Sequence, residues 1–218
     1  MEKLKDIPTE IGPSVPLTMA VYGPLLKENA TAIQSTRRQT FTYGNHERQK
    51  LDVYYPAKTQ KRRPSIYSSN NPVLVFVHGV GLVNGSKTLP LADGLAYANL
   101  GHFFAEKLGY TTVIPDYRLM SHGARHPSGG EDIALVVDWI RETLAKQEGF
   151  GNIDLFVMGN SAGGIHLSTY LFAPEFASSR DKVAATDSEA ATVLRGVVFL
   201  SVPFNMVRFT LTCCTKQY

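Results

Sequence analysis

The sequence predicts an α/β fold, in which a mostly parallel central sheet carries helices on both faces. From residue 73 onward, short apolar runs alternate with longer segments of helical periodicity, which is typical of such sheets. The first of these runs, residues 73–77, is apolar throughout and therefore fits a strand buried on both faces. A chain of 218 residues with 44% hydrophobic residues is also large enough to bury one substantial core.

The N-terminal residues 1–36 are expected to form an arm or cap segment. Prolines at positions 8, 13, 16 and 24 should interrupt any long helix there. Residues 37–218 are assigned to a single domain. It opens with two strand-like runs, 39–43 and 50–55, joined by turn-forming residues, which predicts a hairpin.

The remaining elements are predicted from hydrophobic periodicity and from the residues that begin or end helices and strands. Polar residues 59–72 indicate a loop, and Gly109 is a suitable C-terminal cap for a helix over 92–108. Ser128 and Glu131 have the spacing of a capping box at the start of a helix that ends before Gly149. Further strands are expected at 111–114, 153–158 and 196–200, and a further helix at 162–172.

One turn carries the main chemical signal, the stretch Gly159-Asn160-Ser161-Ala162-Gly163. It follows a predicted strand and opens directly into a predicted helix. A serine on such a tight turn is exposed for attack, and glycines are needed beside it because a Cβ would clash with neighbouring backbone. Ser161 is therefore the candidate nucleophile.

The loop His78-Gly79-Val80-Gly81 follows the predicted central strand, at the carboxyl end of the sheet. Its backbone N–H groups and that of Ala162 could converge near the serine oxygen. Such donors stabilise the oxyanion of an acyl-transfer reaction.

These two motifs and Asp116-Tyr117-Arg118-Leu119 resemble the α/β-hydrolase family, in its branch of carboxylesterases, hormone-sensitive-lipase-like esterases and arylformamidases. The resemblance spans roughly residues 40–202. It implies hydrolysis of carboxylic esters, with formamides or other amides as the alternative, through an acyl-enzyme on Ser161. It further implies oxyanion donors at Gly79, Val80, Gly81 and Ala162, and structural support from His78, Gly159, Gly163 and the pair Asp116 and Arg118.

Two departures from the family pattern shape the expectation for activity. Val80 stands where the family usually has glycine, and valine disfavours positive φ, so we expect either a shifted oxyanion loop or an oxyanion hole built from fewer donors. In the family, the triad acid and histidine follow the serine, after later strands of the sheet. In this sequence the only histidine after Ser161 is His166. Five residues along a helix place His166 about 140° from the serine.

We therefore expect a hydrolase that is C-terminally incomplete, lacks the last strands and the triad acid and histidine, and is weakly active. Asp181, Asp187 and Glu189 are interpreted as residues of a solvated connection. The run 196–200 should then form an unpaired sheet edge.

Two other functions stay open. The fold could serve a non-catalytic protein. Gly79, Gly81 and Gly85, with Asp116 at the end of the next strand, also resemble a dinucleotide-binding turn, although the following helix begins late and the acidic residue lies farther on than usual.

Composition and charge limit the kinds of partner that we expect for this chain. The net charge of +3 is scattered, and the cluster Lys61, Arg62 and Arg63 fits a solvated loop, so we expect no nucleic acid partner. Neither a signal peptide nor a membrane span is evident, which favours a cytoplasmic protein. Asp132 and Asp138 are interpreted as an ordinary helix-face pair, and no metal or cofactor is expected. The substrate is a small-molecule ester or amide, while its two ends and the oligomeric state stay open.

Overall fold

The computed structural model describes residues 4–57, 70–147, 150–184 and 191–204, and in them a six-stranded sheet with the order β1-β2-β4-β3-β5-β6. The central strands β4, β3, β5 and β6 pair in parallel, whereas the hairpin strands β1 and β2 run antiparallel. The predicted mostly parallel sheet and its N-terminal hairpin are thus confirmed. The strands are β1 Arg38–Thr42, β2 Lys50–Tyr54, β3 Asn71–Val77, β4 Thr111–Pro115, β5 Ile153–Asn160 and β6 Thr192–Leu200.

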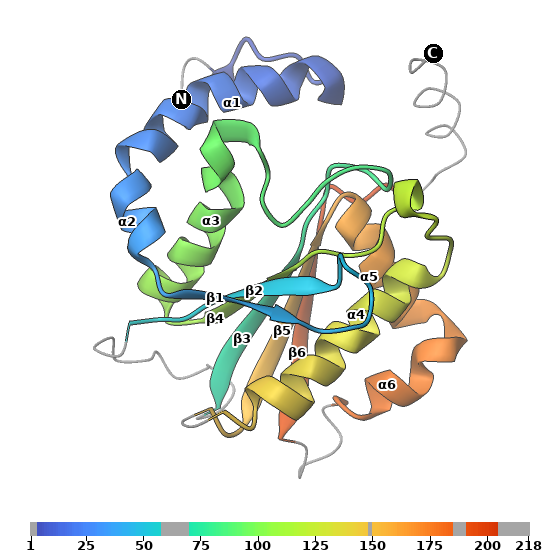
Figure 1. The fold of residues 1–218 in the computed structure, drawn as a ribbon. Helices are drawn as coiled ribbons and strands as arrows, with labels where there is room; N and C mark the ends of the chain where they lie inside the picture. The colour runs from blue at the N-terminus through green and yellow to red at the C-terminus, as the bar shows by residue number, and fades with distance from the viewer. Residues whose placement is uncertain (1–3, 58–69, 148–149, 185–190, 205–218) are drawn as a thin grey trace.

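Helices cover both faces of this sheet, as predicted (Figure 1). On one face lie α1 (Ile11–Glu28), α2 (Ala30–Ser35) and α3 (Leu95–His102), and on the other α4 (Ser128–Trp139), α5 (Ala162–Phe172) and α6 (Ala177–Asp181). A hydrophobic core lies on each face of the sheet. Alternate residues of β3 contribute to the two cores, because successive side chains of a strand point to opposite faces. Val73, Val75 and Val77 join the α4 and α5 side, and Phe76 joins the α3 side.

The N-terminal arm differs from the prediction, because it contains the 18-residue helix α1 with Pro16 and Pro24 inside it. The expectation that prolines would prevent a long helix is wrong. A proline removes the hydrogen bond to the carbonyl four residues earlier. Here those carbonyls belong to Gly12 and Ala20, which are exposed residues whose backbone water can reach. The assigned boundary near residue 36 still separates this helical arm from β1.

The helix predicted over 92–108 begins later than expected. Ala92 and Asp93 have positive φ of 51° and 56° and belong to the short helical turn η2 (Leu91–Gly94), so the regular helix starts at Leu95. It ends in a π-helical turn, η3 (Phe103–Lys107), followed by Gly109 with φ of 75°. Glycine adopts this conformation without strain, which confirms the predicted cap.

The capping box predicted at the start of α4 does not form. The Ser128 hydroxyl instead contacts the backbone of Arg125, and the Glu131 carboxylate accepts a 2.8 Å hydrogen bond from Arg118. The helix begins after Pro127 without a side-chain cap and continues through the π-helical turn η5 (Ile140–Leu144). Short 3-10 turns lie at η4 (Met120–His122) and η6 (Pro174–Phe176).

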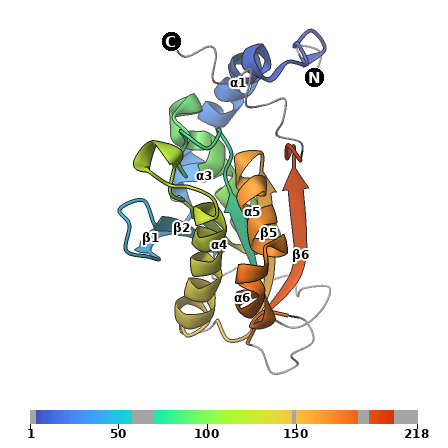
Figure 2. The same ribbon diagram turned by 90° about the vertical axis from the view of Figure 1, so that its right-hand side faces the viewer.

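The strand β6 is the edge of the sheet in the described part of the chain (Figure 2). It begins at Thr192, earlier than predicted, and pairs with β5 through a register shift beside Leu155 and Phe156. The predicted loop 59–72 lies mostly outside the described residues, as do Asp187 and Glu189.

Candidate active site

Ser161 lies on the turn between β5 and α5, with φ of 49° and ψ of −116°. Such a conformation is strained for a residue with a side chain, and strain of this kind gathers at functional sites. Hydrogen bonds hold the turn in place. The Ser161 N–H donates to the Leu200 carbonyl at 2.8 Å, and its carbonyl accepts from the N–H groups of Gly164 at 2.9 Å and Ile165 at 3.2 Å.

The glycines around Ser161 are required by close backbone packing. A Cβ on Gly159 would lie 2.7 Å from the Cα of Gly164, and one on Gly163 would overlap the carbonyl oxygens of Val77 and His78. These are contacts with backbone, which cannot rotate away. The steric reason predicted for the glycines therefore holds. Because these positions carry no Cβ, the start of α5 can pack against the end of β3.

Gly79 lies directly against the nucleophile turn. A Cβ built on Gly79 would be 3.2 Å from the Ser161 Cβ and 2.6 Å from the Asn160 side-chain oxygen. Ala162 follows as the first residue of α5, where backbone N–H groups lack helical partners. The structure thus brings together Gly79, Ser161 and Ala162.

Val80 takes the positive φ that its side chain disfavours. Its φ is 74° and its side chain is 49% exposed, while the following Gly81 has φ of 89°. The loop therefore keeps a glycine-like path through Val80, with the strain stored at this residue.

Tyr117 supports this loop from below, a role that sequence reasoning missed. Its hydroxyl lies 3.0 Å from the His78 carbonyl, 3.3 Å from that of Gly79 and 3.4 Å from that of Gly81. Burial raises the pKa of Tyr117 well above its ordinary value, so the hydroxyl stays protonated and can donate to these oxygens. The tyrosine inside the Asp-Tyr-Arg-Leu motif was the signal that could have revealed it.

His78 is a structural residue of the loop. It is fully buried, its Nδ1 faces the Gly79 carbonyl at 3.0 Å, and its Nε2 faces the Asp116 carboxylate at 3.3 Å. Its ring also stacks on Tyr117, with centroids 4.5 Å apart. Both ring nitrogens therefore face oxygen atoms, one of the loop itself and one of Asp116.

Two basic residues that sequence reasoning missed fasten the far end of the loop. Arg48 donates to the carbonyls of Tyr117 at 2.9 Å and Gly85 at 2.8 Å. The Lys87 N–H donates to the Asp116 carboxylate at 2.5 Å, and its ammonium to buried Asp52 at 2.8 Å. No sequence pattern marks these long-range contacts.

Arg118 does not pair with Asp116, which corrects the expectation of a shared support. Its Nε donates to Asp132 at 2.8 Å and its Nη2 to Glu131. Asp132 is only 1% exposed and also accepts from Gln49, so it is not the ordinary helix-face residue that was expected.

His166 packs between Tyr117 and Gly129. Its ring meets the Tyr117 ring edge-on at 4.5 Å and lies so close to Gly129 that no Cβ would fit there. Its Nε2 is buried without a hydrogen-bond partner in the described structure. Burial, helped by repulsion from His78 and His126, lowers the pKa of His166 to about 4.

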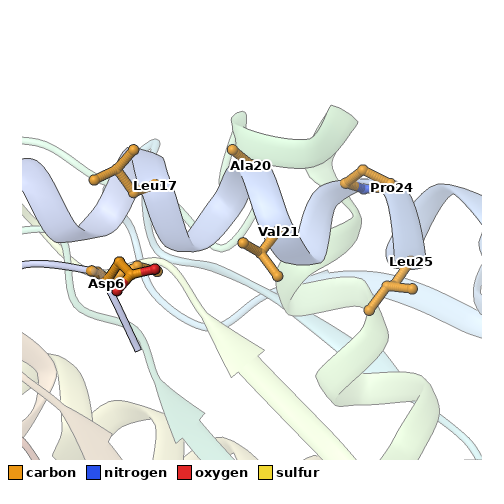
Figure 3. Close-up of a pocket in the computed structure, with 7 residues that line it drawn as sticks. Asp6, Leu17, Ala20, Val21, Pro24 and Leu25 are labelled. Atoms are coloured by element: carbon orange, nitrogen blue, oxygen red, sulfur yellow. The ribbon is translucent and has the colours of Figure 1, made fainter. Parts of the chain in front are cut away.

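Two cavities bear on ligand binding. One of about 220 Å³ lies beside α5 and is lined in part by Leu82, Met120 and Ile165. The other, of about 600 Å³, lies between the N-terminal segment and α1, away from the motifs of the site (Figure 3). In Figure 3, Asp6 lies beside the part of α1 that carries Leu17, whereas Pro24 and Leu25 lie farther along the helix.

Among the described residues, no three His, Cys, Asp or Glu side chains are grouped to hold a metal ion. No helix in the described part is both long and apolar enough to cross a membrane.

Known proteins share part of this sequence. The family model BD-FAE matches residues 51–215. The medium-chain fatty acyl-CoA hydrolase precursor of Anas platyrhynchos is 30% identical over 128 residues, which cover 57% of this chain and 21% of that protein. Esterase LipC of Mycobacterium tuberculosis is 34% identical over 131 residues, which cover 60% of this chain and 28% of that protein.

The solved structures agree on the fold. A candidate thioesterase from Silicibacter sp. TM1040 superposes with a TM-score of 0.53 at 18% identity, covering 98% of this chain and 67% of that one. The chain spans only about 21% to 28% of the length of these two curated relatives.

Proposed function

The chain belongs to the BD-FAE family of α/β-hydrolases, and from this premise we propose that it is a serine hydrolase of carboxylic esters with Ser161 as nucleophile. The observation that carries the proposal is the strained Ser161 on the turn into α5, with the backbone of Gly79 against it. The esterase and acyl-CoA hydrolase named among the relatives support the same reaction class.

The reaction proceeds in two steps. Ser161 Oγ loses its proton and attacks the ester carbonyl, and the carbonyl oxygen becomes an oxyanion that accepts hydrogen bonds from backbone N–H groups of Ala162 and of residues 79–81. The carbon–oxygen bond to the alcohol then breaks, the leaving oxygen takes up the proton that Ser161 lost, and an acyl group remains on Ser161. Water attacks this acyl-enzyme, releases the carboxylic acid and returns the proton to Ser161.

The 218-residue chain itself should react slowly. His166 is the only histidine after Ser161, and it packs against Tyr117 and Gly129, while His78 is held by Gly79 and Asp116. Loss of a triad partner lowers kcat by roughly 10⁴- to 10⁶-fold, and part of the rate enhancement over water survives through the oxyanion donors. The measurable activity should therefore be small but dependent on Ser161.

The test is hydrolysis of p-nitrophenyl butyrate by purified protein and two serine variants. Ser161→Ala should lower the rate, and the hydrolysis above buffer that remains would come from the oxyanion donors and binding alone. Ser168→Ala is the control, because Ser168 lies on the same helix and its hydroxyl bonds only to the Gly164 carbonyl among the described contacts. Equal rates for the wild type and Ser161→Ala would refute the proposal and leave a non-catalytic protein on a hydrolase fold.

A further inference from the structure

The cavity of about 220 Å³ beside α5 adjoins the nucleophile turn but does not include it. The N–H of Ile165, one of its lining residues, donates to the Ser161 carbonyl at 3.2 Å, whereas neither Ser161 nor Gly79 lines the cavity. The walls come from the loop after β3, the segment between β4 and α4, the start of α4, and α5. A molecule bound here would therefore lie next to the nucleophile turn rather than on it.

Arg125 gives the rim of this cavity a positive charge that no carboxylate balances in the described part of the chain. Its Nη1 donates to the Ala124 carbonyl at 3.0 Å, and both residues line the cavity. A carbonyl oxygen occupies one of the five guanidinium N–H groups and leaves the charge in place. The other arginine of the lining, Arg118, is already paired with Asp132 and Glu131. The exposed Arg125 therefore has donors available for an anion.

The surroundings of Arg125 add to this positive character. Residues 119–130 contain one arginine and two histidines and no acidic residue. One of these histidines, His126, lines the cavity beside Arg125. The first residue of α4, Ser128, belongs to the same wall, and the N-terminus of a helix carries partial positive charge. An anion at the rim thus meets attraction from several groups.

The interior of the cavity is uncharged. Leu82, Met120 and Ile165 present aliphatic side chains, and the Thr169 hydroxyl donates to the Ile165 carbonyl at 3.1 Å. His166 adds no charge at pH 7, because burial and two neighbouring histidines lower its pKa to about 4. The cavity therefore suits a molecule with one negative end and one apolar end.

Volume and charge together define the class of this molecule. Pockets for drug-sized ligands measure about 300 to 1,000 Å³, so a cavity of 220 Å³ suits a smaller one. At roughly 30 Å³ for each water-sized unit, it holds about seven non-hydrogen atoms. One guanidinium binds a carboxylate through two parallel hydrogen bonds and balances its single charge, whereas a phosphate monoester carries nearly two charges.

We propose that this cavity binds small aliphatic carboxylates of about four or five carbons, with the carboxylate on Arg125 and the aliphatic chain against Met120 and Ile165. The site is separate from the nucleophile and does not depend on the proposed function. Its occupancy places a negative charge next to the turn that carries Ser161.

The test is titration of the 218-residue protein with sodium pentanoate at pH 7, followed through the NMR methyl signals of Ile165 and Met120. Pentanoate should shift both signals with a dissociation constant of about 1 mM, a reasonable affinity for seven non-hydrogen atoms. Pentanamide has the same shape without the charge, and acetate has the charge without the chain. Each should bind at least about tenfold more weakly than pentanoate.

Two arginine variants test the charge at the rim. Arg125→Gln should weaken pentanoate binding about tenfold and leave the binding of pentanamide unchanged. Arg141→Gln is the matched control, because Arg141 lies in η5, where α4 continues, pairs with Asp138 at the surface and does not line the cavity. It should bind both compounds as the wild type does.

A titration of Ser161→Ala distinguishes this site from the nucleophile. The variant should bind pentanoate with wild-type affinity, whether or not the wild type hydrolyses esters, so the carboxylate site and the proposed function can fail independently. Loss of pentanoate binding in Ser161→Ala would place the ligand on the nucleophile and overturn the proposal. Equal affinities for pentanoate and pentanamide, wild-type pentanoate affinity in Arg125→Gln, or no shifts at about twenty times the expected dissociation constant would also overturn it.

Discussion

Val80 shows how the loop beside Ser161 stores strain in one residue. A β-branched residue at φ of 74° is disfavoured, whereas glycine reaches the same conformation freely. Val80→Gly should therefore raise the free energy of unfolding by about 1 kcal/mol, measured by urea denaturation. Val83→Gly in the same loop is the control and should lower stability, because Val83 is exposed without a positive φ and glycine adds only backbone entropy. Equal effects of the two variants would show that Val80 is unstrained.

His166 should make stability depend on pH. Its pKa falls from an ordinary value of 6.5 to about 4 in the folded protein, so folding favours the neutral ring. This contribution is fully present above pH 6.5 and is lost as the pH falls from 6.5 towards 4. The difference in unfolding free energy between wild type and His166→Phe should therefore shift in favour of the variant across that range. A difference that is constant with pH would contradict the assigned burial.

At the scale of elements, Asp132 ties α4 to the segment after β4 and to the turn before β2. Its carboxylate accepts from the Arg118 N–H at 2.7 Å, the Arg118 Nε at 2.8 Å and the Gln49 amide at 2.7 Å. Asp132→Asn should lower the free energy of unfolding by about 2 to 4 kcal/mol, because an amide places donors against donors in a buried site.

Asp138 on the same helix provides the matched control for this change. It is 38% exposed and pairs with Arg141 at the surface. Asp138→Asn should change stability by less than about 0.5 kcal/mol, since exposed ion pairs contribute little. Thermal and urea unfolding of both variants would check the contrast, and similar losses would refute a special role for Asp132.

Element prediction succeeded where local patterns decide the structure and failed where distant contacts do. The apolar run 73–77 and the glycines around Ser161 revealed β3 and the turn into α5. The capping box predicted at Ser128 does not form, because Arg118, ten residues before Ser128, donates a hydrogen bond to the Glu131 carboxylate. Helix α1 was missed because exposed backbone tolerates proline, which a proline count does not show.

Prediction of the site had the same limit. The serine turn and the glycine loop are adjacent in space as expected, whereas the hydroxyl of Tyr117 beneath the loop and the anchors Arg48 and Lys87 depend on contacts across many residues. Residue spacing along the chain carries no information about such contacts.

At the scale of the whole molecule, the edge strand β6 should govern self-association. Val198 is 42% and Leu200 39% exposed on this nine-residue strand, and in the described residues it pairs only with β5. Unpaired apolar edges template further pairing, and a lysine there opposes it. We expect concentration-dependent association that Val198→Lys reduces, measured by sedimentation velocity.

The control for the edge is Phe172→Lys, which removes a larger exposed apolar side chain from helix α5. It should leave association nearly unchanged, because a helix offers no unpaired strand. If Phe172→Lys reduces association as much as Val198→Lys does, general hydrophobic attraction rather than strand pairing is responsible.

The central claim, that Ser161 attacks a carboxylic ester, is tested most directly by mass spectrometry of the protein after brief reaction with p-nitrophenyl butyrate. The proposed function leaves Ser161 without a histidine partner in this chain, so deacylation should be slow and the acyl-enzyme should accumulate. The account predicts a butyryl group on the peptide that contains Ser161, and none on Ser161→Ala. Hydrolysis without acylation of that peptide, or with acylation that persists in Ser161→Ala, would contradict it.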